Sequence, residues 1–302
     1  MTALVALDWG SSRLRAWRLD HAGTVLDERA SDDGASRLQG GAAAFDAAWL
    51  RLTDGWPAVP TIACGMVGSA HGWREAPYLD CPRALDALHE GLVRVATSRG
   101  NTVHLVPGLM QRGPAPDVMR GEETQLAGLL QAAPEMAAHA RVVMPGTHSK
   151  WVDLVDGRVQ GFATRMTGEL FALLRDHSVL ARLMAPGAAT DDAAFDHGVA
   201  TAQAGEGADL ARWLFGVRAR GLFGELAPEA SAGFLSGLLI GAEIASALRD
   251  DTGAPLVLVG EPALTQRYAR ALHAFGRAAR SFPQPLAAGG LWQVARAAGL
   301  LR

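Results

Sequence analysis

The stretch RVVMPGTHSKWVDLVDGRVQGFATRM, residues 141–166, decides the fold. It begins with an apolar run, continues through a turn at residues 145–150, and ends in two strand-like runs joined at Asp156-Gly157. We predict three consecutive strands here. The turn combines glycine, hydroxyl residues and a cation, so it presents free backbone N–H groups, O–H donors and positive charge at one point. A polyphosphate group requires such a site.

The same pattern occurs near the N-terminus. Apolar residues 4–7 precede Asp8-Trp9-Gly10-Ser11-Ser12-Arg13, and residues 14–19 lead into a returning strand at residues 24–28. A strand–turn–strand unit used twice suggests two half-molecules of related design that hold a nucleotide between them.

Strand-like and helix-like segments alternate along the rest of the chain, which is typical of a layered α/β protein with ligand groups at strand ends. We therefore predict two α/β domains of related topology around a nucleotide cleft. The first spans residues 1–138 and the second residues 139–302, and the C-terminal helix packs back towards the first domain.

Composition narrows the function classes. The 302 residues are 49% hydrophobic and 20% charged, the formal net charge is −3, and there is no long basic run. A nucleic-acid partner is not expected, because it would need a basic surface. Cys64 and Cys81 lack metal-ligand spacing, so neither zinc nor a disulfide framework is expected. We expect a cytoplasmic protein without a membrane partner, since the apolar residues 233–248 include Glu243 and are too few to span a bilayer.

Periodicity predicts the remaining elements. Apolar positions recur at helical spacing in several segments, and short apolar runs predict buried strands. The predicted helices cover residues 42–56, 85–95, 122–130, 167–183, 191–217, 264–275 and 292–301, and the predicted strands cover residues 61–63, 103–106 and 256–259. Residues 108–119 are expected to be extended. Gly233, Gly237 and Gly241 share one helix face, which predicts close packing against a neighbour.

Two groups of polar residues have both a functional and a structural explanation. Ser69, Trp73 and Tyr78 lie in or beside a loop whose aromatic faces suit a sugar-like ligand, or whose aromatic side chains pack inward. Glu122 and Glu123 open a helix, where the helix dipole favours carboxylates without any catalytic role. Both explanations remain open for each group.

These residues resemble a known family. Residues 8–12 are similar to the first phosphate motif of the actin-like ATPase and sugar kinase superfamily, and Gly146-Thr147-His148-Ser149 is similar to its second. More specifically, residues 65–69, 72–78, 119–125, 145–151 and 166–171 resemble the 2-dehydro-3-deoxygalactonokinase family. The resemblance extends over most of the chain and is weakest between residues 185 and 230.

The resemblance implies a kinase that uses ATP and Mg²⁺ to phosphorylate 2-dehydro-3-deoxy-D-galactonate at its terminal 6-hydroxyl, in galactonate catabolism. Asp8 would hold the metal ion and Glu123, or its neighbour Glu122, would be the catalytic base. The phosphates and nucleotide would be bound by Gly10, Ser11, Ser12, Arg13, Gly146, Thr147, His148, Ser149, Lys150 and Gly260. Ser69, Trp73 and Tyr78 would line the sugar pocket.

Two departures from the superfamily pattern leave choices open. Related sugar kinases commonly place aspartate where this chain has Glu123, and they often show two glycines where it has Gly260-Glu261. The substrate carboxylate calls for an arginine, because the guanidinium fork matches a planar carboxylate. Arg15 and Arg120 are both candidates.

Other functions fit the same motifs. A kinase for another sugar acid such as 2-keto-3-deoxygluconate, a nucleotide or polyphosphate hydrolase, and a nucleotide sensor all remain. The expected partners are a small sugar acid and ATP, and the choice between monomer and homodimer is open.

Overall fold

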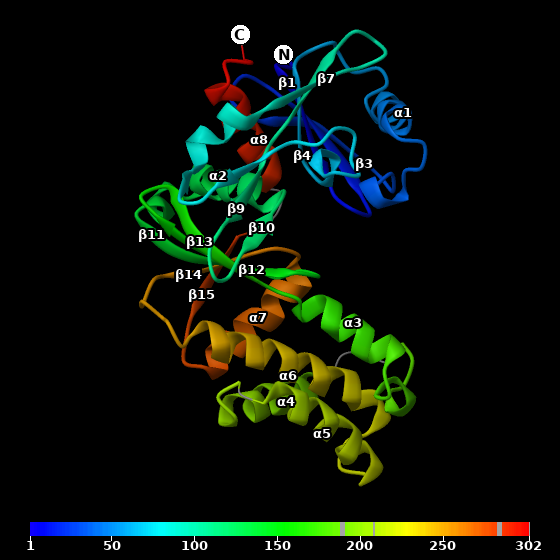
Figure 1. The fold of residues 1–302 in the computed structure, drawn as a ribbon, viewed down its shortest axis with the longest axis vertical. Helices are drawn as coiled ribbons and strands as arrows, with labels where there is room; N and C mark the ends of the chain where they lie inside the picture. The colour runs from blue at the N-terminus through cyan, green and yellow to red at the C-terminus, as the bar shows by residue number, and fades with distance from the viewer. Residues whose placement is uncertain (188–190, 208, 283–285, 302) are drawn as a thin grey trace. The chain divides into compact units, whose positions relative to one another are not determined.

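The computed structural model describes residues 1–187, 191–207, 209–282 and 286–301. They form two compact units, each with its own sheet and helices (Figure 1). Unit 1 consists of Met1–His139, Asp153–Phe162 and Gln284–Arg302, and unit 2 of Ala140–Val152 and Ala163–Pro283. Both units are α/β, as predicted.

Unit 1 is built on a six-stranded sheet in the order β3-β2-β1-β4-β8-β7. Its strands are β1 (Leu4–Trp9), β2 (Leu14–Leu19), β3 (Val25–Ser31), β4 (Thr61–Gly65), β7 (Val93–Ala96) and β8 (Thr102–Leu105). The neighbours β1, β4 and β8 are parallel, and their apolar runs are buried on both faces. The carboxyl ends of β1 and β4 therefore meet at one edge, where ligand groups of α/β proteins gather.

Helix α1 (Ala42–Leu52) ends one turn earlier than predicted. Gly55 has a φ of 74°, a left-handed conformation that glycine adopts without strain and that stops the helix. Trp56, expected on the helix, instead donates from Nε1 to Asp27 at 3.1 Å.

The predicted helix over residues 85–95 is wrong. A 3₁₀ helix, η3 (Leu85–Gly91), is followed directly by strand β7. Val93 and Val95 pair with Leu105 and Val103 on β8, and β-branched residues fit a pleated surface well. The leucines at helical spacing are thus followed by valines that pair in the sheet, so the helical pattern does not extend to residue 95.

Residues 108–119 are extended, as predicted. They form part of a three-stranded sheet in the order β10-β9-β5, made of β5 (Tyr78–Asp80), β9 (Gly108–Gln111) and β10 (Asp117–Met119). A further short strand, β6 (Arg83–Ala84), pairs with β13 (Arg158–Arg165).

Helices α2 (Glu122–Ala132) and α8 (Leu286–Ala297) of unit 1 pack with their backbones nearly in contact. A Cβ atom on Gly290 would lie 1.8 Å from the carbonyl oxygen of Thr124, and one on Gly128 would lie 1.9 Å from that of Leu286. Helix α8 begins earlier than the predicted start at residue 292, so residues 287–290 are helical. Their small side chains serve this close packing, which fixes the first turn of α2.

Unit 2 contains strands β15 (Ala279–Phe282), β14 (Leu256–Val259), β11 (His139–Met144) and β12 (Ser149–Val155) in that order. The strands of the stretch that decides the fold, β11, β12 and β13, occur as predicted. Strand β15 was not predicted, because it has four residues and two of them are arginine and serine. It pairs in parallel with the buried β14.

The helices of unit 2 are α3 (Thr167–His177), α4 (Asp192–Ala204), α5 (Leu210–Leu222), α6 (Pro228–Ala247) and α7 (Pro262–Ala274). The helix predicted over residues 191–217 is two helices, because Glu206, Gly207 and Asp209 adopt positive φ between them. Helix α3 ends at His177, earlier than predicted. Short 3₁₀ turns elsewhere in the chain are η1 (Ala35–Arg37), η2 (Met66–Gly68), η4 (Pro134–Ala137) and η5 (Ala181–Leu183).

Helix α6 crosses α4 at a glycine stripe, as predicted. A Cβ atom on Gly237 would lie 1.9 Å from the carbonyl oxygen of Phe195 in α4, and one on Gly233 would lie 2.6 Å from that of Asp191. By length and composition α6 could cross a membrane, but 78% of its most apolar window is buried inside the structure. It is placed as a core helix of unit 2.

Candidate active site

Asp8 lies at the end of β1 between two neighbouring strands. Its partner in register on β2 is Arg15, and its partner on β4 is Cys64. Arg15 Nη2 is 2.5 Å from Asp8 Oδ2, and the Cys64 thiol is 3.9 Å from Oδ1. The pairing gives Arg15 a structural role as the partner of Asp8.

The turn after β1 is open to solvent. The Gly10 N–H donates to the Arg13 carbonyl at 2.9 Å, which closes the turn, while Ser11, Ser12 and Arg13 are exposed. Gly34 lies against the buried side of the turn, because a Cβ atom there would approach the Ser12 carbonyl carbon to 2.2 Å. The backbone of the turn therefore packs against Gly34, and the side chains of Ser11 and Ser12 are exposed to solvent.

Glu123 is a fully buried carboxylic acid in the first turn of α2. Its Oε2 accepts from the Gly121 N–H at 2.7 Å, and its Oε1 accepts from the Thr124 hydroxyl at 2.9 Å. Burial, and then the neighbouring charge of Glu122, raise the pKa of Glu123 to about 8, although these hydrogen bonds oppose the shift. A general base works best with a pKa near the operating pH.

Two glycines bring the strand ends and α2 together. Gly121 has a φ of 108°, and a Cβ atom there would lie 3.3 Å from the Gly65 Cα; a Cβ atom on Gly65 would lie 2.7 Å from the Trp9 carbonyl oxygen. Burial raises the pKa of the Cys64 thiol, and the charges of Asp8 and Glu123 act in the same direction. Cys64 therefore lies between the two carboxylates.

Glu122 is partly exposed and has a backbone partner. Its Oε2 accepts from the Arg120 N–H at 3.0 Å, which is a helix-start arrangement of the kind that the dipole explanation predicts. The two carboxylates thus differ in environment, since Glu122 is partly exposed whereas Glu123 is fully buried and has a raised pKa.

Arg120 is buried, and part of its guanidinium group is unpaired. Nη2 donates to the Ala76 carbonyl at 2.8 Å, and the guanidinium lies 4.2 Å from the centre of the Tyr78 ring. Nε and Nη1 are buried and have no hydrogen-bond partner. An unpaired buried donor costs free energy, so this side chain is suited to receive an acceptor such as a carboxylate.

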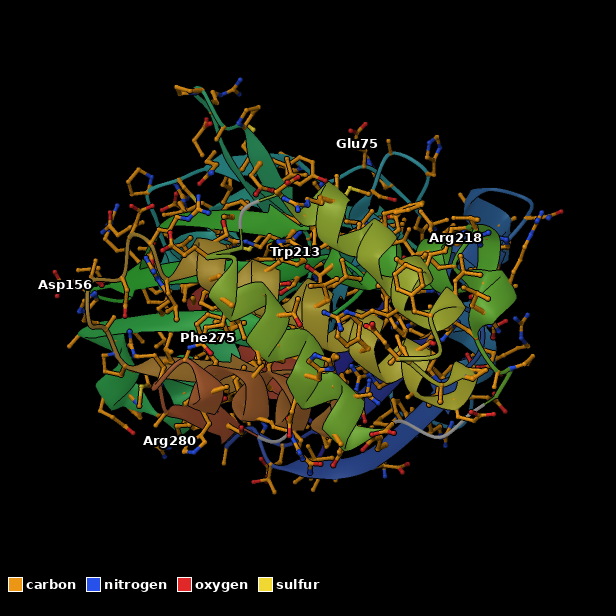
Figure 2. All side chains as sticks on the ribbon, turned by 90° about the horizontal axis from the view of Figure 1, so that it is seen from below. Glu75, Asp156, Trp213, Arg218, Phe275 and Arg280 are labelled. Carbon is orange, nitrogen blue, oxygen red and sulfur yellow. The ribbon has the colours of Figure 1, made fainter. Side chains whose placement is uncertain are left out.

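The loop before β5 contributes less than its composition suggests. Trp73 packs in the core, with its ring centre 5.9 Å from that of Trp9 and 6.4 Å from that of Phe45. Glu75 is exposed and its side chain points away from the ribbon (Figure 2). The half-buried Ser69 and Tyr78 remain candidates for a ligand, and Tyr78 lies against Arg120.

The second phosphate turn, in unit 2, divides into an accessible and a buried half. Thr147 and His148 are exposed, whereas Ser149 and Lys150 are buried. His148 Nε2 lies 2.5 Å from Glu169 Oε2 on α3, and the Glu169 N–H donates to the Thr147 carbonyl at 3.0 Å. Gly146, Thr147 and His148 are thus the accessible part of this turn, and Ser149 faces the interior.

Gly260 lies against the same turn. A Cβ atom at this position would be 3.3 Å from the Pro145 carbonyl oxygen. The neighbouring Glu261 caps α7, since its carboxylate accepts from the Leu264 N–H at 3.1 Å. The residue that replaces a second glycine therefore has a structural function.

Unit 2 also contains a pocket that sequence reasoning missed. Its volume is about 650 Å³, and it is lined by α3, α6 and α7 with Phe171, Arg175, Gly233 and Arg267 among the lining residues. Pockets of this size hold ligands such as a nucleoside. Gly233 was the one signal in the sequence, because its spacing with Gly237 and Gly241 marked a close approach.

The carboxylates fit Mg²⁺ as kinases use it. Among the residues that the structure describes, no group of three or more His, Cys, Asp or Glu side chains could hold a metal ion. Mg²⁺ in kinases needs only one or two carboxylates, because nucleotide phosphates and water complete its coordination. Asp8, at a strand end beside the exposed turn, suits that requirement.

Comparison with known proteins decides the family. A sequence profile of the 2-keto-3-deoxy-galactonokinase family matches residues 8–294. The chain belongs to this family. The match confirms the predicted resemblance and the prediction of a sugar-acid kinase, an enzyme class for which ATP is a substrate.

Individual relatives agree with the family. The chain is 40% identical over 285 residues to the 2-dehydro-3-deoxygalactonokinase of Escherichia coli (strain K12), covering 91% of each protein. A crystal structure of a Sinorhizobium meliloti protein assigned as a 2-dehydro-3-deoxygalactonokinase is 39% identical, with a TM-score of 0.87 over 97% of this chain and 98% of that one.

More distant structures share the fold alone. Component A of the (R)-2-hydroxyglutaryl-CoA dehydratase of Acidaminococcus fermentans has a TM-score of 0.54 at 13% identity, covering 99% of this chain and 100% of that one. Structural similarity at such low sequence identity shows a shared fold and does not indicate a shared function.

Proposed function

We propose that this kinase transfers a phosphoryl group from ATP to the terminal 6-hydroxyl of 2-dehydro-3-deoxy-D-galactonate. The observation that supports the acidic substrate is Arg120, which is buried beside Tyr78 with Nε and Nη1 unpaired. A substrate carboxylate would satisfy both donors, and a neutral hexose would leave them unpaired. The relatives that carry the substrate in their names are similar over nine tenths of the chain.

Glu123 takes the proton of the attacking hydroxyl. For this step the sugar hydroxyl has to reach the fully buried Glu123 and replace the Thr124 hydroxyl, which now donates to Oε1. The surrounding low-polarity site favours the protonated acid, so the group that receives the proton is stabilised after transfer. Glu122 holds the backbone of Arg120 and is the alternative base.

Each unit has a turn of similar design that suits phosphate groups. Gly10, Ser11, Ser12 and Arg13 in unit 1, and Gly146, Thr147 and His148 in unit 2, offer backbone N–H groups and accessible side chains to the phosphates. Gly260 and the pocket beside Phe171 and Arg267 take the nucleoside. Lys150 is buried, so it would act on the phosphates through its charge and not through a direct contact.

Asp8 would hold Mg²⁺, and Arg15, whose Nη2 lies 2.5 Å from Asp8 Oδ2, orients the carboxylate for it. When bound, the ion neutralises charge on the phosphate oxygens. Asp8→Asn is expected to lower magnesium-dependent turnover by at least about tenfold, roughly 1.4 kcal/mol of transition-state stabilisation. Titrating Mg²⁺ in steady-state assays checks this, with sugar-acid binding unchanged as the control. Normal turnover at limiting Mg²⁺ would make Asp8 a structural partner of Arg15.

A coupled ADP-release assay over a small panel of acceptors tests the substrate. ADP release should depend on 2-dehydro-3-deoxy-D-galactonate and prefer it over its fourth-carbon epimer, 2-keto-3-deoxygluconate, and over glucose. Preference for the epimer would reassign the sugar acid. Release without any acceptor would favour a hydrolase, and binding of ATP without release would favour a sensor.

The setting of the reaction follows the same proposal. A cytoplasmic enzyme with no nucleic-acid or membrane partner fits the small substrates, and a homodimer is open to measurement by light scattering.

A further inference from the structure

Glu243 is a buried carboxylate of unit 2 whose hydrogen-bond acceptors are all occupied. Its Oε1 accepts from the Ser149 hydroxyl at 2.6 Å and from Trp151 Nε1 at 2.7 Å. Its Oε2 accepts from the Tyr268 hydroxyl at 2.8 Å and from the Thr167 hydroxyl. A carboxylate has about four lone-pair sites, and four donors fill them here.

The four donors come from three different elements. Ser149 and Trp151 begin β12, Thr167 is the first residue of α3, and Tyr268 lies in α7, while Glu243 itself is on α6. A charged acceptor strengthens each of these hydrogen bonds, and its low-polarity surroundings raise the cost of losing any of them. Glu243 therefore joins four elements of unit 2 at one buried point.

Those elements shape the phosphate turn. Helix α3 begins against it, because the Glu169 N–H donates to the Thr147 carbonyl and a Cβ atom on Gly168 would lie 2.4 Å from the Gly146 carbonyl oxygen. The turn before α7 touches it as well, since Gly260 packs on the Pro145 carbonyl. Ser149 is the last residue of the turn and is fully buried. Glu243 thus contacts β12, which continues the turn, and the two helices α3 and α7, which begin beside it.

We propose that Glu243 is the positioning residue of the phosphate-binding turn at residues 145–150, holding the turn, α3 and α7 in one arrangement from the buried side. The proposal rests on the nucleotide role proposed for this turn. It reassigns the Ser149 hydroxyl, which donates to Glu243 and has no proton left for a phosphate oxygen. Gly146, Thr147 and the backbone of His148 remain to bind phosphate.

The test compares Glu243→Gln with wild type in the full chain. Glutamine keeps the size but offers one acceptor oxygen and one NH₂ donor, so two of the four hydroxyl and indole donors lose their partner. A non-hydrolysable ATP analogue with Mg²⁺ should bind at least about tenfold more weakly by calorimetry. The KM for the sugar acid should stay within about twofold, because its proposed contacts are in unit 1.

A matched control separates positioning from a general loss of stability. Ser231 is another buried polar residue of α6, but its hydroxyl donates to its own helix at Ala227. Ser231→Ala should leave affinity for the analogue unchanged. Hydrogen exchange should become faster at residues 145–151 and 167–170 in Glu243→Gln and not in Ser231→Ala.

Two results would overturn the proposal. One is a folded Glu243→Gln protein that binds the analogue within about twofold of wild type; the other is an equal loss of analogue and sugar-acid binding. If Glu243→Gln does not fold, Tyr268→Phe and Thr167→Val each remove a single donor to Glu243. Each of these variants should bind the analogue more weakly than wild type, and the double variant more weakly still. Unchanged affinity in both single variants would contradict the proposal. If wild type binds the analogue but releases no ADP with any sugar acid, the proposed kinase reaction is wrong. The effect of Glu243→Gln on analogue affinity would still test the positioning role.

Discussion

Replacing Glu123 by glutamine is expected to slow turnover at least about a hundredfold while ATP and sugar-acid binding change little. Glutamine keeps the acceptor for the Gly121 N–H or the Thr124 hydroxyl but cannot take a proton. Steady-state kcat, with binding measured separately by calorimetry, checks this. The helix-dipole explanation predicts only about 0.3–1 kcal/mol of lost stability and near-normal turnover.

Glu122→Gln is the matched control for this experiment. Its carboxylate is partly exposed and accepts from the Arg120 N–H, so the substitution should cost little turnover. An active Glu123→Gln with an inactive Glu122→Gln would move the base back by one residue. Activity in both variants would remove the base from this helix altogether.

Arg120→Lys should raise the KM for the sugar acid at least about tenfold, and up to about a hundredfold. Lysine keeps a positive charge but loses the planar fork that meets both carboxylate oxygens, and a hydrogen bond to a charged group contributes about 1.5–3 kcal/mol. Sugar-acid KM and ATP KM measured on the same preparation check this, and the ATP value should be nearly unchanged.

A neutral substrate analogue distinguishes recognition from structure in this variant. Arg120 also donates to the Ala76 carbonyl and lies over the Tyr78 ring, so part of any loss could come from disturbed packing. The amide of the sugar acid lacks the negative charge and should be a poor substrate for both proteins. Equal loss on acid and amide would show that Arg120 only supports the loop. Arg15→Lys, altering the partner of Asp8, should then be tested for the carboxylate instead.

The sequence predicted the parts of the fold whose local pattern and tertiary surroundings agree. The two strand–turn–strand units, the opening of α2 at Glu122 and the glycine stripe of α6 all occur where periodicity placed them. Segments failed where the surroundings override the pattern. Leu85 and Leu88 suggested a helix that continues to Val95, but the valines of β7 pair with β8 instead. The predicted start of the C-terminal helix at residue 292 is too late, because the close contact of α8 with α2 at Gly290 does not show in the local sequence pattern.

The candidate site divides in the same way. Its polar residues at strand ends were predictable, because chemistry-bearing side chains collect there. The hydrogen bonds that sort them were not. Arg15 pairs with Asp8 across two strands, Ser149 turns inward to Glu243, and Trp73 joins Trp9 and Phe45 in the core. Each choice depends on strand pairing or on a tertiary partner that residue spacing does not reveal, so spacing alone left both explanations open.

The pH dependence of kcat/KM for the sugar acid, compared between wild type and Glu123→Gln, tests the central claim most directly. Because the pKa of Glu123 is raised to about 8, the protonated form that cannot act as a base dominates below that pH. Wild-type kcat/KM should therefore rise with pH, reach half of its limiting value near about pH 8 and level off above it, and the residual activity of Glu123→Gln should lack this rise. The same acidic limb in both proteins, or a variant as fast as wild type, would contradict Glu123 as the base of this sugar-acid kinase.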